Sequence, residues 1–126
     1  MKFLLIYFIL LQGEMAMSKN VWKGTAVLII KKDRLADFKK AVAKIFEPTK
    51  KEKGCLSYEG YQVFDEVGNE TNRFEFHEIW QTKEAMLIDH KENSEHMKEF
   101  FKEIKAGTKE SYLESFVVDG KLVTII

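Results

Sequence analysis

The sequence has only one cysteine and no excess of charge of either sign. The single cysteine, Cys55, cannot form an internal disulfide, and its place at the start of a predicted strand is typical of a small buried hydrophobic residue. Twenty basic residues balance twenty acidic ones, so the chain lacks the basic footprint of proteins that bind nucleic acid or anionic membranes. We therefore expect one globular domain in the 126 residues, with neither nucleic acid nor membrane as a partner.

The motifs of several large enzyme classes are also absent. The sequence contains no GxSxG nucleophile elbow, no glycine-rich phosphate loop and no dinucleotide fingerprint. Three histidines and one cysteine are too scattered along the chain to predict a metal site. Aromatic residues are plentiful instead, with ten phenylalanines, four tyrosines and two tryptophans. This surplus favours an aromatic-lined cavity or an apolar interface between subunits.

The first twenty residues differ in character from the rest. Lys2 is followed by an apolar run over residues 3–11, and residues 16–18 fit a cleavage site, a pattern typical of a secretory signal. The run is too short to cross a bilayer as a helix. Residues 1–20 are therefore predicted to be a signal-like or non-native extension, and an exported or periplasmic location follows if the signal is used.

A second interpretation is that translation begins at Met17. The codons of residues 12–14 can contain a bacterial ribosome-binding sequence at a suitable distance before it. The protein is then expected in the cytoplasm. Under either interpretation residues 21–126 form the working domain.

Apolar periodicity along this domain predicts the element order β-α-β-β-α-β. The four main strands are expected at residues 21–30, 55–64, 73–81 and 111–118. One helix follows the first strand and another follows the third. This order is that of an α+β, ferredoxin-like fold with one antiparallel sheet. One face of the sheet would lie under the helices, and the other carries apolar residues that a second copy of the chain would cover.

Capping and turn residues set the expected ends of these elements. Asp33 and Thr82 are predicted N-caps, a fresh cap is expected at Asn93-Ser94, and Gly107 is predicted to follow the last helix at C′. Pro48 is expected to end or bend the first helix. Asp119-Gly120 is a hairpin signal, which predicts that residues 122–126 return as a short extra strand.

The third strand contains one carboxylate within an aromatic series. Alternation places Phe74, Phe76, Glu78 and Trp80 on one face, toward the helices. A buried Glu78 needs a partner, and His90 on the following helix is the nearest candidate. The alternative is that Glu78 is solvated at the sheet edge and that His90 caps the end of its helix.

The other candidate residues also have two interpretations. Trp80 is either a core residue or a flat surface for a planar ligand. His96 is expected to be exposed or capping, and His77 points to the opposite face of the sheet, toward solvent or a dimer interface.

These residues, taken in order, form a longer motif. It runs Glu47-Pro48, Glu52-x-Gly54-Cys55-Leu56-x-Tyr58, Phe76-x-Glu78-x-Trp80, Glu84-Ala85-Met86, His90 and Ser94-x-His96-Met97. The motif resembles the antibiotic biosynthesis monooxygenase domain, a group that includes quinol monooxygenases, over about residues 21–118. The intervals on both sides of His90 are slightly longer than the resemblance implies, which points to a different helix register there.

The resemblance implies a dimeric α+β barrel with a pocket between sheet and helices in each subunit. Several relatives oxidise hydroxylated aromatics with O₂ and without metal or flavin, because an ionised hydroquinone is electron-rich enough to reduce O₂. The resemblance therefore implies a cofactor-independent monooxygenase that acts as a homodimer on a small quinol-like substrate. The protein would deprotonate, desolvate and orient that substrate.

The resemblance also assigns roles to residues. The implied catalytic residues are His90, Glu78 and Trp80, and the implied substrate-binding residues are Phe76, Phe74, Tyr58, Tyr61 and His96. His90 would be the base or the hydrogen-bond partner of the phenolate, with Glu78 orienting it. Trp80 and Phe76 would enclose the ring. Tyr58 and Tyr61 are three apart on one strand, so only one of them can point into the pocket.

Two alternatives remain open at this point. Relatives include haem-degrading proteins, and Trp80 and His90 match two of their three site residues. The third is an Asn on the first strand, and residues 21–30 contain none, which argues against haem degradation but leaves binding of haem or another planar ligand open. The other alternative is an isomerase or signal-processing protein of the same fold.

Overall fold

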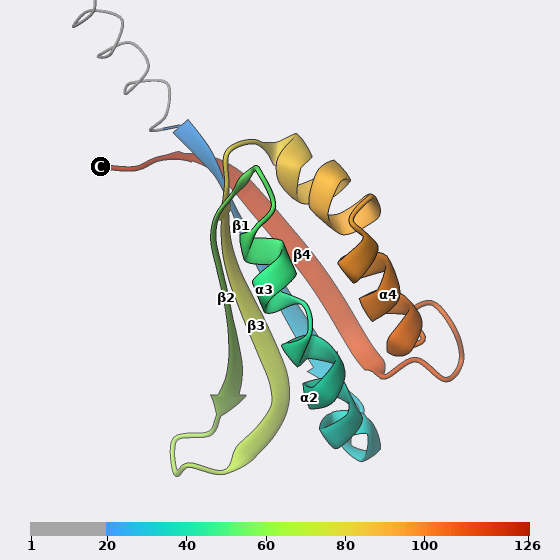
Figure 1. Cartoon of the computed structure of the whole chain (residues 1–126). Coiled ribbons are helices and arrows are strands. Elements are labelled where there is room, and N and C mark those ends of the chain that lie inside the picture. The colour runs from blue at the N-terminus through green and yellow to red at the C-terminus, as the bar shows by residue number, and fades with distance from the viewer. Residues whose placement is uncertain (1–19) are drawn as a thin grey trace, which may run out of the picture.

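The computed structural model describes residues 20–126 and contains one antiparallel sheet with strand order β2-β3-β1-β4 (Figure 1). The strands are β1 (Asn20–Ile30), β2 (Cys55–Phe64), β3 (Glu70–Trp80) and β4 (Leu113–Thr124). The chain order of strands and helices is the predicted one, so the α+β ferredoxin-like fold is confirmed. Apart from Asn20, the expected extension and the start at Met17 lie outside the described residues.

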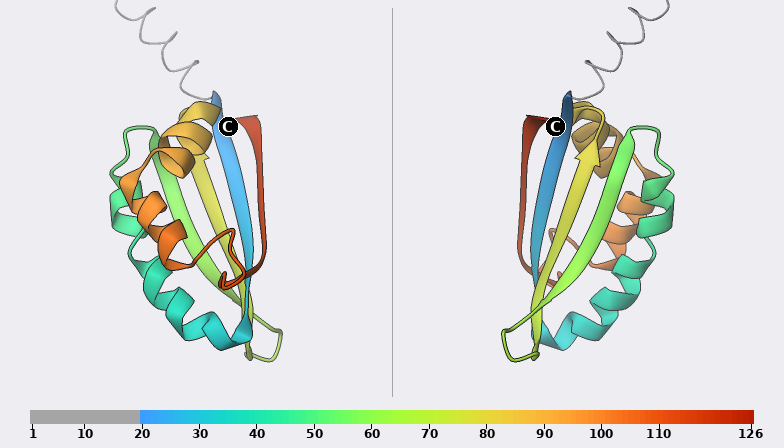
Figure 2. Two further views of the ribbon diagram at one scale, coloured as in Figure 1. Left: turned by 90° about the vertical axis from the view of Figure 1, so that its right-hand side faces the viewer. Right: turned by 90° about the vertical axis from the view of Figure 1, so that its left-hand side faces the viewer.

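The helices lie together on one face of the sheet (Figure 2). They are η1 (Lys32–Arg34), α2 (Leu35–Ala43), α3 (Phe46–Lys50), the π-helix η2 (Ala85–Glu92) and α4 (Glu95–Glu103). Within the described part of the chain, no helix is both long enough and apolar enough to span a membrane.

The predicted faces of β3 are confirmed. Glu78 pairs with Gly24 on β1 and with Tyr58 on β2, in the middle of the sheet. Phe74, Phe76, Glu78 and Trp80 are all buried toward the helices. The core thus lies between this face and the helices, and Glu78 is the carboxylate within it.

The first helix departs from the prediction at both ends. Asp33 lies in the 3₁₀ turn η1 and makes no capping hydrogen bond, because the helical turn starts at Lys32 rather than after Asp33. The helix breaks between Ala43 and Phe46, before Pro48. Pro48 instead occupies the first turn of α3, where its missing N–H leaves no hydrogen bond unmade.

The second helical segment is capped as predicted at its start but not at its end. Thr82 Oγ1 accepts a hydrogen bond from the Ala85 N–H at 3.0 Å. The residue at C′ of α4 is Lys105, with φ of +56°, and not Gly107. The Ala106 and Lys105 N–H groups bond back to the carbonyls of Phe101 and Lys102, which is a Schellman ending.

The predicted hairpin at Asp119-Gly120 does not form, and β4 runs straight through it. Gly120 pairs with Gly24 on β1 within a continuous ladder. A Cβ at position 120 would lie 2.5 Å from Nε1 of Trp22. Gly120 is therefore explained by the close approach of the Trp22 indole, and not by a turn.

Candidate functional site

A cavity lies between the helix-facing side of the sheet and the helices η2 and α4. The cavity is small as it stands, with a volume of about 30 Å³, which is room for one or two water molecules. The lining is mainly aliphatic and aromatic, and its polar members among the described residues are Tyr58, Glu78, His90 and Lys91. An apolar cavity with a few convergent polar groups is the usual form of a small-molecule site.

Glu78 is a buried member of this lining, with a side chain that is 3% exposed. The Trp80 indole Nε1–H donates a hydrogen bond to Glu78 Oε1 at 2.9 Å. Burial raises the pKa of Glu78 to about 7, and the Trp80 hydrogen bond opposes this shift only in part. The interpretation of Glu78 as a solvated edge residue is thus wrong, because β3 is a central strand.

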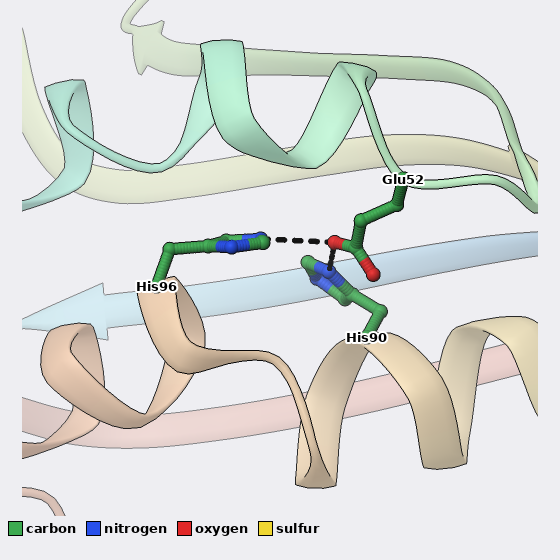
Figure 3. A group of neighbouring side chains, drawn as sticks. All are labelled: Glu52, His90 and His96. Carbon is green, nitrogen blue, oxygen red and sulfur yellow. Dashed lines mark hydrogen bonds and ion pairs between the residues drawn. The ribbon is translucent and has the colours of Figure 1, made fainter.

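His90 does not pair with Glu78 as expected. Its Nδ1 lies 2.6 Å from Oε2 of Glu52, and Nε2 of His96 lies 2.9 Å from the same oxygen (Figure 3). Glu52 comes from the loop between α3 and β2, whereas the two histidines come from η2 and α4. The carboxylate that orients His90 is therefore Glu52.

The protonation states of this cluster follow from its burial. Burial, with the nearby charges of Asp89 and Glu78, raises the pKa of Glu52 to about 7. Burial, followed by the influence of His96, lowers the pKa of His90 to about 3. Burial also lowers the pKa of His96. Both imidazoles are thus neutral at pH 7, and each N–H that faces Glu52 Oε2 can donate to it.

The π-helix η2 places His90 in this position. Its wide turns close with an i→i+5 hydrogen bond from the Asn93 N–H to the Ile88 carbonyl. Ser94 occupies the N-cap position of α4, but its hydroxyl donates to the His90 carbonyl at 2.6 Å instead of capping the helix. The long intervals around His90 in the sequence correspond to this π-helix, a form that often occurs at functional sites.

The other predicted catalytic residue, Trp80, is fully buried and lies outside the cavity lining. Its ring centroid is 4.8 Å from that of His90, and its N–H is bonded to Glu78. It therefore contacts two candidate site residues and offers no open face to a ligand.

The predicted substrate-binding residues divide between the cavity and other places. Phe76 and Tyr58 line the cavity. Phe74 instead packs against Phe38 of α2, with ring centroids 4.8 Å apart. Tyr61 is half exposed on the opposite face of the sheet, next to His77, so Tyr58 is the tyrosine that points inward. His96 is neither exposed nor capping, since it is bonded to Glu52.

Glu52 is the site residue that the sequence reasoning missed. It stands in a run of charged residues, 50–53, and such a composition by itself indicates a solvent-exposed segment. The available signal was that Glu52 opens the Glu-x-Gly-Cys-Leu-x-Tyr motif. Cys55 of that motif is half buried, and burial raises the pKa of its thiol to about 11, in agreement with an unreactive cysteine.

The comparisons with known proteins agree with this fold. The sequence pattern of the family described as antibiotic biosynthesis monooxygenase matches residues 25–103. A protein from Pseudomonas aeruginosa has a similar structure, with a TM-score of 0.66 at 20% identity, covering 86% of this chain and 97% of that one. A conserved protein from Methanosarcina mazei Go1 gives a TM-score of 0.65 at 22% identity, covering 83% and 94%.

A further structure, named as an antibiotic biosynthesis monooxygenase, gives a TM-score of 0.61 at 22% identity and covers 83% of this chain and 98% of that one. No curated protein matches the sequence significantly. At these identities the solved structures establish the fold alone, and the match over residues 25–103 establishes the family.

Proposed function

The chain belongs to the antibiotic biosynthesis monooxygenase family, and on this premise we propose that it oxidises a small, quinol-like hydroxylated aromatic with O₂. One observation carries the proposal: Glu78 and His90, two groups able to accept protons or hydrogen bonds, line the same largely apolar cavity. The apolar lining matches the chemistry of an aromatic ring, and the few polar groups match its hydroxyl groups. The cavity of about 30 Å³ would have to widen to admit the ring, through movement of the side chains that line it.

Glu78 is the better proton acceptor of the two. With a pKa of about 7, it is half ionised near neutrality and can take a proton from a substrate hydroxyl. His90, with a pKa of about 3, is neutral and a weaker base. Its Nδ1–H is directed to Glu52, which leaves the Nε2 lone pair as a hydrogen-bond acceptor. We therefore assign Glu78 as the base and His90 as the group that orients the substrate.

The substrate itself supplies the electrons in this proposal. Once a hydroquinone is deprotonated, the electron-rich ring reacts with O₂, so that a hydroquinone and O₂ give a hydroxyquinone and water. One oxygen atom enters the ring, the other becomes water, and the ring supplies all the reducing electrons. The protein therefore requires no flavin or metal for this step, and the apolar walls favour it because they exclude water.

The same proposal includes a homodimer. The sheet face opposite the helices carries Val27, Ile29, Ile79 and Val117, and Val117 is 60% exposed. The same face also carries charged residues such as Lys23 and Glu75, and a second copy of the chain would bury the apolar side chains among them. Each subunit would retain its own cavity on the helix side.

The test is oxygen consumption with a small hydroquinone by the purified protein. Glu78→Gln is expected to lower kcat by roughly 100-fold or more, the usual size of a lost general base. His77→Ala is the matched control, because His77 lies on the opposite face of the sheet and should leave activity unchanged. In the wild type, kcat/KM should rise with pH through about 7, since Glu78 acts as a base only when ionised.

Two results would contradict this function. Full activity in Glu78→Gln would show that Glu78 is not the catalytic base. A Soret band on addition of haemin, without oxygen consumption by any quinol, would support the haem-binding alternative instead. Asn20 does not strengthen that alternative, because its side chain is exposed at the start of β1 and accepts a hydrogen bond from Thr124.

A further inference from the structure

We propose that Glu52, His90 and His96 form a binding site for one divalent first-row transition ion of the Zn²⁺ type. The three side chains converge from separate segments of the chain, and each imidazole directs one nitrogen to the same Glu52 carboxylate oxygen (Figure 3). Two imidazole nitrogens and one carboxylate oxygen are a ligand set typical of zinc and of non-haem iron. This inference goes beyond the oxygen chemistry, which uses no metal.

The distances suit an ion after a small adjustment. Each of the three residues offers one ligand atom within 4.8 Å of those of the other two, and Glu52 Oε2 lies 2.6 Å from His90 Nδ1 and 2.9 Å from His96 Nε2. In a tetrahedral zinc site with bonds of about 2.0–2.1 Å, neighbouring ligand atoms are about 3.3 Å apart. The two contacts to Glu52, at 2.6 and 2.9 Å, would each have to widen by roughly half an ångström. A rotation of the Glu52 side chain, which lies on a loop, can provide this. The ligand nitrogens of the two histidines, up to 4.8 Å apart, would in turn have to approach each other.

The surroundings also favour a cation. No Lys or Arg of residues 20–126 lies within ion-pair distance of Glu52, Glu78 or Asp89. The Glu52 and His90 side chains are 15% and 5% exposed, so water screens this charge poorly. A bound divalent ion would supply the missing positive charge.

The backbone holds the two histidines ready for this role. Ser94, which stands between them, ties the end of η2 to the start of α4 through its bond to the His90 carbonyl. The ligands are thus held by two helices and one loop, and water would supply a fourth ligand. Three protein ligands with water in the fourth position are the usual arrangement of zinc sites that are not purely structural.

The ion would lie beside the cavity rather than in it, because neither Glu52 nor His96 belongs to the lining. Coordination through Nδ1 of His90 requires the proton of the neutral imidazole to be on Nε2. His90 would then donate a hydrogen bond into the cavity instead of accepting one. Metal binding and the metal-free chemistry would therefore compete for the same imidazole.

Calorimetric titration of the full chain with Zn²⁺, after treatment with chelator, tests the site. We expect one ion per chain with micromolar or tighter affinity. Glu52→Gln and His96→Ala should each weaken binding by at least about tenfold, since each removes a ligand. His77→Ala is the matched control, because the His77–Glu75 pair is exposed and has no third ligand, and it should bind as the wild type does.

Zn²⁺ should also raise the Tm of the wild type and of His77→Ala, but not that of the two ligand variants. If His96→Ala does not fold, His96→Gln keeps a polar side chain there and replaces it. Equal affinity in all variants, or wild-type binding weaker than about 1 mM, would overturn the proposal and leave surface binding only. Zinc binding without quinol oxidation would support this site and reject the proposed function. Quinol oxidation without zinc binding would support the proposed function and reject this site.

Discussion

At the scale of single residues, the main finding is the separation of two carboxylates with different partners. Glu78 is bonded to an indole and lines the cavity, whereas Glu52 is bonded to two imidazoles beside it. Each carboxylate has its pKa raised to about 7 by burial. Of the groups in this site with a pKa value on either side of neutrality, the two acids therefore change protonation near pH 7, and His90 does not.

Glu78 should make stability depend on pH. Its pKa is about 7 in the folded protein and 4.5 without burial, so the folded state binds more protons between these values. The contribution of Glu78 to the free energy of unfolding is fully present below about pH 4.5 and is lost as the pH rises to about 7. Above that pH it no longer changes. The shift corresponds to about 3 kcal/mol. The free energy of unfolding, measured with urea at several pH values between about 4.5 and 7, should decline less steeply in Glu78→Gln than in the wild type.

Glu75→Gln provides the comparison on the same strand. Glu75 lies on the opposite face, and its hydrogen bond from Arg73 lowers its pKa, so it does not cause a decline in this range. The wild-type decline should persist in Glu75→Gln. An identical decline in Glu78→Gln would show that Glu78 is not the group responsible.

At the scale of elements, the helix ends are where local conformation departs from sequence preference. Lys105 adopts the left-handed conformation at C′ of α4, a place usually taken by glycine. Gly107 is also left-handed, with φ of +79°, but lies two residues further on. The helix therefore ends earlier than its glycine suggests, at some cost in backbone strain.

Lys105→Gly should stabilise the protein by about 1 kcal/mol, because glycine adopts positive φ without a steric penalty. The measurement is the free energy of unfolding in denaturant. Lys102→Gly makes the same change inside the last turn of α4 and should have the opposite effect, a loss of about 1 kcal/mol. If Lys105→Gly and Lys102→Gly changed the free energy of unfolding in the same direction, this description of the helix end would be wrong.

The elements also show what the sequence could predict. Alternation correctly placed Glu78 among the aromatics, since a strand has a strict period of two residues. The predicted hairpin at Asp119-Gly120 was wrong, because glycine occurs both in turns and where another side chain packs closely against the backbone. Only the position of the Trp22 side chain distinguishes these two cases. Glu52 was missed because its partners lie far along the chain, and no local pattern indicates such a contact.

At the scale of the whole molecule, the helices cover only one face of the sheet (Figure 2). The proposed homodimer would use the opposite face.

Val117→Asp should then produce a monomer that remains folded, because a carboxylate cannot be buried in the interface without a partner. Light scattering measures the mass, and circular dichroism measures the fold. Leu122→Asp is the control, since Leu122 is 70% exposed on the helix-side face of the same strand and should leave the dimer intact. A Val117→Asp protein of unchanged mass would locate the interface elsewhere.

The contacts of Glu52 also bear on the order of folding. They join residues 38 and 44 positions apart, across the two halves of the domain. Contacts of this length form only after the intervening chain is confined, so the cluster should be completed late, when η2 and α4 dock against the first half. A chain that has folded only its first hairpin has the carboxylate but neither imidazole. The cluster of Glu52, His90 and His96 is thus a marker for the completed fold.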